Sequence, residues 1–197
     1  MIRLRDRLRG ETQAAILEAA EHVFGTEGMD RARMESIAAR AGVAVGTLYN
    51  HFEDRDALLA SLVAARRAAL LARLDDALAE GKEMGFEGAL SAFLRALFEH
   101  WAAHRAFLAV LFQGNRLDRT APGRGAVLAE VNRRAEAVLE RGREEGKLRR
   151  DEDGFQSSLL VGMVWGTLVK EVIQDAGEVG VDRAERVLDV FLRGAGR

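Results

Sequence analysis

The chain has 197 residues, 48% of them hydrophobic and 30% charged, with a formal net charge of −2. This composition is typical of a folded globular protein and too apolar for a disordered one. The length suffices for one sizeable domain, or for a small domain joined to a larger one. Because there is no cysteine, disulfides and thiolate metal sites are excluded.

The sequence also argues against membrane insertion and secretion. Its richest apolar stretch, from Leu159 to Val169, falls well short of the ~20 residues that a helix needs to cross a bilayer. The N-terminus carries alternating arginines and no apolar stretch follows them, so no secretory signal is expected. We therefore expect a cytoplasmic protein.

Good helix formers dominate the chain, and Pro122 is the single proline, so helices are expected nearly throughout. The first should cover about residues 12–24, where apolar residues recur at the spacing of a buried stripe, and Gly25 and Gly28 should end it. Asp54 is expected to cap a long helix reaching about Glu80. The other expected helices cover about residues 34–41, 86–103, 105–115, 124–145, 155–175 and 183–193.

The segment from Ala39 to Phe52 reads ARAGVAVGTLYNHF and is typical of a helix-turn-helix. Gly42 can adopt the left-handed conformation that ends one helix and redirects the chain into the next. Val43, Leu48 and Phe52 fall about one turn apart and should face inward. The outer side, which would meet the DNA major groove, then carries Val45, Gly46, Thr47, Tyr49, Asn50 and His51.

The run from Ile16 to Leu59, with AGV, GTLYNHF and RDALL in order, resembles the DNA-binding head of the tetracycline-repressor (TetR) family of bacterial transcriptional regulators. The resemblance covers roughly the first third of the chain. It implies an all-α fold in which a three-helix head, residues 1–52, joins an all-helical ligand-binding and dimerisation body, residues 53–197.

The resemblance also implies how the head would contact double-stranded DNA. Hydroxyl, imidazole and guanidinium groups can donate to phosphate oxygens, and Gly46 lets the recognition helix approach the backbone. The implied backbone contacts are Thr47, Tyr49, His51 and Arg55. Asparagine pairs with adenine and methyl groups pack on thymine, so base reading would fall to Val45, Thr47 and Asn50.

Two positions depart from the family pattern. Ala44 stands where the family often has a serine that caps the recognition helix, and Arg33 stands where a threonine or serine often precedes the second helix. A missing hydroxyl cap typically costs ~1 kcal/mol of helix stability. The serine at the first position also reaches a phosphate in the family, so its loss should lower DNA affinity.

The charge of the head is unusual for a DNA-binding domain. Residues 1–60 contain eight arginines, no lysine and ten acidic residues, a net charge of −2, whereas such domains are usually basic. Four arginines precede the first expected helix and could form an arm that reaches a minor groove or the flanking phosphates. The alternative is a disordered, solubilising terminus. These arginines are Arg3, Arg5, Arg7 and Arg9.

The last two expected helices are predicted to form a homodimer interface. Their apolar surface is too wide for one neighbour, and Gly162 and Gly166 permit close helix approach. The resemblance implies a four-helix bundle between two copies, with the recognition helices one DNA turn apart on a palindromic operator. The alternative is that the stripe is buried within the monomer. The apolar residues are Leu159, Leu160, Met163, Val164, Leu168, Val169, Val172, Ile173, Ala184, Val187, Leu188 and Phe191.

Aromatic residues are frequent in the body, and most should be plain packing. Family bodies commonly hold an apolar ligand among their middle helices, so the resemblance implies a small apolar or aromatic effector whose binding shifts the spacing of the two heads. The candidate ligand-binding residues are Phe93, Leu97, Trp101, Arg105, Phe112 and Trp165.

The sequence gives little indication of a metal site, a catalytic site or a cofactor site. His100 and His104 lie four residues apart and could share a metal only with a further ligand, so structural roles are favoured over a metal site. No catalytic or cofactor-binding motif is recognisable, and no cofactor is expected. The leading hypothesis is a dimeric, ligand-responsive transcriptional repressor. The alternative is a helical binding protein whose helix-turn-helix is vestigial or contacts protein.

Overall fold

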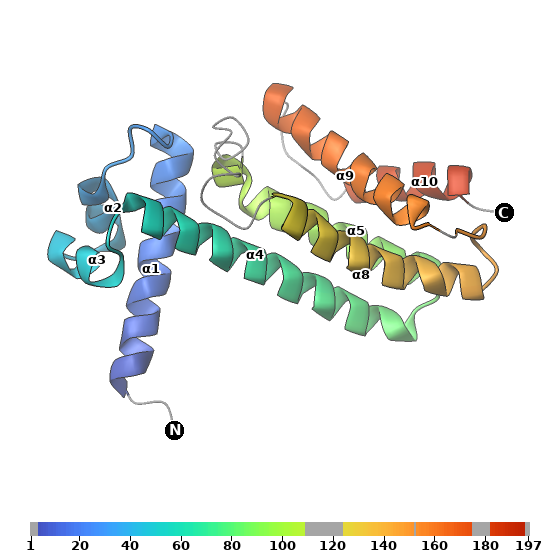
Figure 1. Cartoon of the computed structure of the whole chain (residues 1–197), viewed down its shortest axis with the longest axis horizontal. Coiled ribbons are helices and arrows are strands. Elements are labelled where there is room, and N and C mark those ends of the chain that lie inside the picture. Colours follow the sequence, from blue (N-terminus) through green and yellow to red (C-terminus); the bar gives the residue numbers. More distant parts are fainter. Residues whose placement is uncertain (1–3, 109–123, 152, 175–181, 196–197) are drawn as a thin grey trace. The chain divides into compact units, whose positions relative to one another are not determined.

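A computed structural model describes residues 4–108, 124–151, 153–174 and 182–195 (Figure 1). Every helix or strand assigned within these ranges is a helix, which confirms the expected all-α class. The contacts divide the chain into two compact units. Of the described residues, the first unit holds 4–66 and 104–108, and the second holds 67–103 and those from 124 onward.

The first unit contains α1 (Leu4–Glu27), α2 (Met34–Ala41), α3 (Val45–His51) and the start of α4 (Arg55–Glu80). Its core is continuous across these helices and also includes Phe107, which is fully buried. The body expected from the sequence, residues 53–197, includes Phe107, whereas in the structure this ring belongs to the unit that holds the helix-turn-helix. The core side chains are Ile16, Ala19, Ala20, Val23, Phe24, Met29, Ala32, Met34, Ile37, Ala38, Leu48, Phe52, Leu58, Leu59, Leu62 and Phe107.

Helix α1 starts earlier than predicted, and of the two glycines expected to end it only Gly28, which has φ 82° and follows the last helical residue Glu27, does so. It begins at Leu4 rather than near Thr12, so the arginines from Arg5 onward belong to a helix and do not form an arm. Gly25 lies inside the helix rather than at its end. A Cβ there would come within 2.9 Å of the Cβ of Ala106. Gly25 therefore serves a close contact with the chain that follows α5.

Helix α4 begins as predicted. The backbone N–H of Ala57 donates to Oδ1 of Asp54 at 2.7 Å, which satisfies one of the donors that a helix leaves unpaired at its N-terminus. The helix runs from Arg55 to Glu80 and continues from the first unit into the second.

The second unit contains the rest of α4, the 3-10 turn η1 (Gly81–Glu83), α5 (Phe86–Ala103), α8 (Arg124–Glu144), α9 (Phe155–Gln174) and α10 (Asp182–Ala195). Helix α5 packs against α8 and α10, and α9 packs against the same two helices (Figure 1). The predicted helix over 105–115 is helical at 105–108, and its remainder lies outside the described residues. None of the described helices is long and apolar enough to span a membrane.

Polar contacts fix the ends of two helices in the second unit. The backbone N–H of Phe86, at the start of α5, donates to the carboxylate of Glu145 at 3.1 Å. This bond is the largest influence on the pKa of Glu145 and lowers it. Burial raises the pKa by less, so the pKa lies below its ordinary value. The guanidinium of Arg141 donates to the carbonyl of Gly81 at 2.6 Å. These bonds position the turn between α4 and α5 against the end of α8.

Candidate nucleic-acid interface

The turn between α2 and α3 is built on Gly42. This residue has φ 69° and ψ 27°, the left-handed conformation predicted for it. Its N–H donates to the carbonyl of Ala39 at 3.2 Å, and the N–H of Val43 donates to Ala38 at 3.0 Å. This pair of bonds is the Schellman arrangement that closes a helix and turns the chain sharply. It sets the direction in which α3 leaves α2.

Helix α3 has a buried side and an exposed side, as expected. Leu48 is fully buried and Phe52 is 4% exposed, while Val43 packs partly against the same core. Tyr49 is 47% exposed. Of the other residues predicted to contact DNA, Thr47 and His51 are half-buried, and the exposed ones are Val45, Gly46 and Asn50. The structure thus places the predicted contact residues together, and their roles towards DNA stay predictions.

Gly46 has no packing role that a larger residue would disturb. A Cβ built on it meets no atom within 4 Å, and the residue is exposed in the first turn of α3. The small size of Gly46 would therefore matter for a molecule that approaches α3 from outside, because a glycine exposes backbone that a side chain would cover.

The two departures from the family pattern have the expected structural consequence. Arg33 and Ala44 occupy the N-cap positions of α2 and α3, and neither makes a side-chain capping bond. Both have the extended backbone conformation of an N-cap residue. At each position the backbone conformation would allow a hydroxyl side chain to cap the helix, but the side chain present makes no such bond.

Arg55 has an internal partner that the sequence did not reveal. Its Nη1 donates to the backbone carbonyl of Met29 at 2.9 Å, so this half-buried side chain fastens the start of α4 to the loop between α1 and α2. A guanidinium has five N–H donors, and this bond uses one of them. The predicted phosphate contact would share the side chain with this structural role.

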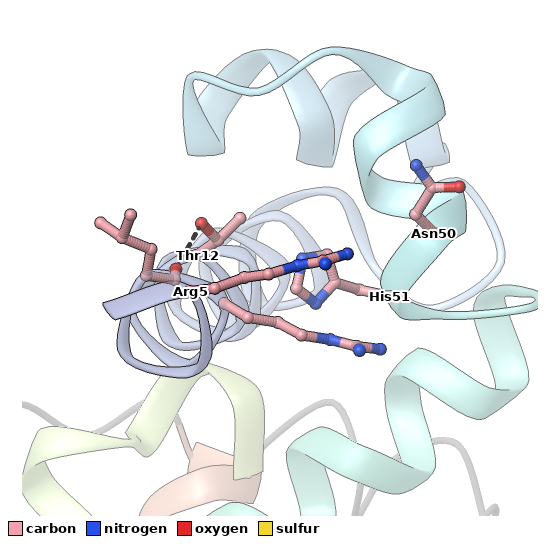
Figure 2. Close-up of a pocket in the computed structure, with 6 residues that line it drawn as sticks. Arg5, Thr12, Asn50 and His51 are labelled. Carbon is pink, nitrogen blue, oxygen red and sulfur yellow. Dashed lines mark hydrogen bonds between the residues drawn. The ribbon is translucent and has the colours of Figure 1, made fainter. Parts of the chain in front are cut away.

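A groove of about 400 Å³ lies between the N-terminal turns of α1 and the C-terminal end of α3. Figure 2 shows the Arg5 side chain extending from α1 in the direction of His51. The hydroxyl of Thr12 donates to the carbonyl of Leu8 at 2.9 Å within α1. The groove was not foreseen, because the sequence suggested an arm where α1 lines it. Its lining residues are Arg5, Leu8, Arg9, Thr12, Asn50 and His51.

The candidate ligand residues are only partly brought together. Phe93, Leu97 and Trp101 are buried in the second unit. The indole rings of Trp101 and Trp165 meet edge to face, with centroids 6.4 Å apart and planes at 73°. Arg105 belongs to the first unit, and Phe112 lies outside the described residues. The buried members form aromatic packing typical of a core.

The histidine pair is divided between the two units. His100 is 7% exposed and belongs to the second unit, whereas the ring of His104 hydrogen-bonds to Glu21 of α1 at 2.6 Å in the first. Within the described ranges, no group of three or more His, Cys, Asp or Glu side chains is placed to hold a metal ion.

Comparison with known proteins assigns the helix-turn-helix to a family. The family profile described as "Bacterial regulatory proteins, tetR family" matches residues 16–62. The HTH-type transcriptional regulator TtgW of Pseudomonas putida is 33% identical over 105 residues, covering 53% of this chain and 75% of TtgW. The chain belongs to the TetR family.

Other TetR-family relatives match a shorter part of the sequence. The HTH-type transcriptional repressor BepR of Brucella suis biovar 1 (strain 1330) is 42% identical over 57 residues, covering 29% of this chain and 27% of BepR. The matched stretch is thus about a quarter of that relative's length.

The fold extends through the body. The transcriptional regulator FadR of Bacillus subtilis, solved in complex with stearoyl-CoA, superposes with a TM-score of 0.72 at 20% identity, covering 92% of this chain and 98% of FadR. The TetR-family architecture of a helix-turn-helix head and a helical body is therefore shared, although the body sequences have diverged.

Proposed function

We propose that this TetR-family chain is a dimeric repressor that occupies a palindromic operator and is released by a small, mostly apolar ligand. The observation that carries the DNA-binding part is the exposed side of α3. Leu48 and Phe52 anchor the other side in the core, so the hydroxyl, amide and imidazole groups are presented on a rigid element. Rigid presentation is what direct reading of base edges requires.

Repression is the simplest mechanism for such a protein. A dimer that occupies promoter DNA blocks transcription without needing any further surface. BepR, which is similar to this chain over 57 residues, is described as a transcriptional repressor. As a bacterial regulator that must reach operator DNA, the protein would act in the cytoplasm.

An exposed apolar face on α9 supports dimerisation through the last two helices. Much of the apolar stripe predicted for the interface is instead buried within the second unit, namely Leu160, Val164, Leu168, Ala184, Val187 and Phe191. Phe155 and Leu159 of α9 are 64% and 44% exposed on another face. Gly162 and Gly166 continue that face, and a Cβ on either would meet nothing within 4 Å. On α10, Val190 is 59% exposed. A second copy would cover these groups and bring two heads to one operator.

The ligand proposal has two supports. FadR of Bacillus subtilis was solved with stearoyl-CoA, which carries a long acyl chain. The second unit of this chain offers an apolar, aromatic interior around Phe93 and Trp101. An apolar effector would act by binding the released conformation more tightly than the DNA-bound one.

Selection of bound fragments from genomic DNA tests this function directly. The full-length protein is mixed with sheared genomic DNA at moderate salt, and the retained fragments are sequenced. A recurring palindrome with half-sites about one helical turn apart is expected. Asn50→Ala should then relax the base preference at one position of each half-site, because a bidentate contact to adenine is lost.

The same selection can overturn the proposal. If no sequence is enriched and binding to DNA is weak and insensitive to salt, the helix-turn-helix is vestigial or contacts protein. If a palindrome is enriched but Asn50→Ala weakens binding equally for all operator variants, Asn50 contacts the backbone and the base-reading assignment is wrong.

A further inference from the structure

The groove between α1 and α3 brings two arginines of the head next to the exposed end of α3. Arg5 and Arg9 are four residues apart in α1 and so lie on one face of it. The opposite wall carries Asn50 and His51, the last residues of α3 (Figure 2). The groove is thus continuous with the surface predicted to contact DNA.

The side chains that line the groove carry positive charge and no negative charge. No carboxylate lines it, and neither Arg5 nor Arg9 forms an ion pair or a side-chain hydrogen bond with any residue of the described chain. Arg7, on a different face of the same helix, pairs with Glu11 at 3.1 Å. Two like charges one turn apart destabilise a helix slightly, and an anion between them would reverse that effect.

The donor set of the groove matches a phosphodiester. A guanidinium presents parallel N–H groups that fit two phosphate oxygens at once. The ring of His51 adds an N–H donor on the opposite wall. The groove, about 400 Å³ in volume, admits a phosphate group together with its hydration.

We propose that this groove binds a phosphate of the DNA backbone beside the base pairs that α3 faces, with Arg5 and Arg9 as the principal donors. This assignment rests on the proposed function and extends it: α1 becomes part of the DNA interface. It also explains how a head with a net negative charge can bind DNA. The positive charges of Arg5 and Arg9 are concentrated on one wall of the groove, whereas Arg7 is paired with Glu11.

The test uses the full-length dimer and the palindrome recovered by genomic selection. Four proteins are compared: wild type, Arg5→Ala/Arg9→Ala, Arg5→Lys/Arg9→Lys and the matched control Arg7→Ala, which removes one charge from the same helix. Each is titrated on two duplexes, one ending at the edge of the palindrome and one with about one further helical turn, ~10 bp, on each side. Affinity is measured over a series of salt concentrations, and circular dichroism checks that helix content is kept.

The double alanine variant should bind the longer duplex roughly tenfold or more weakly than wild type, since hydrogen bonds between charged groups are lost. Its plot of log affinity against log salt should be shallower by about 1 for each lost phosphate contact. Arg7→Ala should keep the wild-type affinity and slope within about twofold, and the double lysine variant should recover the slope because its charge is kept. A neutral methylphosphonate placed at the contacted phosphate should weaken wild type and leave the double alanine variant unchanged.

Three results would overturn the assignment. Equal behaviour of Arg5→Ala/Arg9→Ala and Arg7→Ala on a palindrome that wild type binds tightly would show that the groove takes no part. A loss that follows the A·T content of the flanks, with no methylphosphonate effect, would place the arginines in the minor groove. A loss of helix content in the alanine variant, with the lysine variant folded but still lacking the salt slope, would also contradict it. Failure of wild type to select any palindrome would instead count against the proposed function.

Discussion

The ring nitrogen Nδ1 of His104 lies 2.6 Å from Oε1 of Glu21, and this bond fastens the chain just after α5 to the middle of α1. The second oxygen of Glu21 accepts a hydrogen bond from Nε of Arg66 at 2.6 Å. One carboxylate thus joins three segments of the first unit that are distant in sequence. Burial raises the pKa of Glu21, but the hydrogen bonds and charges of His104 and Arg66 lower it by more, so it lies below its ordinary value.

Glu21→Gln should destabilise the protein at pH 7 by about 1–3 kcal/mol, because charged hydrogen bonds are lost. The carboxylate stabilises the folded state at pH values above its unfolded pKa of about 4.5, and this contribution disappears as the pH falls through the lower folded-state pKa. Urea denaturation from pH 7 to pH 3 should therefore show the two proteins converging in stability. Glu18→Gln, on the exposed side of the same helix, is the control, and equal effects of both substitutions would refute this role.

Gly46→Ala should separate DNA binding from stability. A Cβ at this position meets open space, and alanine favours helix over glycine by up to about 1 kcal/mol, so the stability should be unchanged or higher. If DNA approaches the backbone here, operator affinity should fall at least severalfold. Binding titrations and thermal denaturation on the same sample measure both effects, and unchanged affinity would show that the DNA backbone does not approach Gly46.

Gly42→Ala should have the opposite pattern, acting on stability first. The left-handed conformation at φ 69° costs a residue with a Cβ about 1–2 kcal/mol, although no neighbour would clash with the added atom. Chemical denaturation should show this loss. Gly10→Ala, at an exposed helical glycine of α1 that also has open space around it, should not be destabilising. Equal stability of Gly42→Ala and wild type would mean that the turn relaxes to a different conformation.

Ala44→Ser should restore a missing cap. The residue already has the extended N-cap conformation, with φ −65° and ψ 146°, but no side-chain bond. A serine hydroxyl there should raise the free energy of unfolding by about 0.5–2 kcal/mol and add a donor near the DNA backbone, tightening operator binding. Ala44→Val, which adds bulk without a hydroxyl, is the matched comparison, and the prediction fails if both variants behave alike.

Leu159→Glu should impair dimerisation without unfolding the monomer. The side chain is 44% exposed on the unpartnered face of α9, and a charge buried in a dimer interface without a partner is strongly unfavourable. Analytical ultracentrifugation should show a shift towards monomer, accompanied by weaker operator binding. Met84→Glu, at an apolar residue that is 43% exposed elsewhere in the second unit, should leave the association state unchanged. If Leu159→Glu remains fully dimeric, the dimer uses another surface.

Local signals in the sequence predicted much of the head. The cap at Asp54 and the left-handed turn at Gly42 depend on residues that act within a few positions of themselves, and both were correctly predicted. The start of α1 was not, because the run from Leu4 to Glu11 contains no strong N-terminal signal and its alternating arginines suggested a charged arm.

Contacts between segments that are distant in sequence could not be predicted from such local signals. Gly25 has the sequence signature of a helix end, yet its small size serves the approach of Ala106. The bond from Arg55 to the carbonyl of Met29 likewise depends on the fold as a whole. The groove between α1 and α3 depends on the extension of α1 to Leu4, because four of its lining residues belong to the first turns of that helix.

The place of Phe107 in the core of the head has a consequence for synthesis. Because this fully buried ring comes from a segment that follows α5, a ribosome that has released only the first 66 residues has released an incomplete core. We therefore expect the head to reach its full stability only after Phe107 has emerged, although domains usually fold in order from the N-terminus. An excised fragment of residues 4–66 would lack this ring, so we expect it to be less stable than the same segment in the full chain.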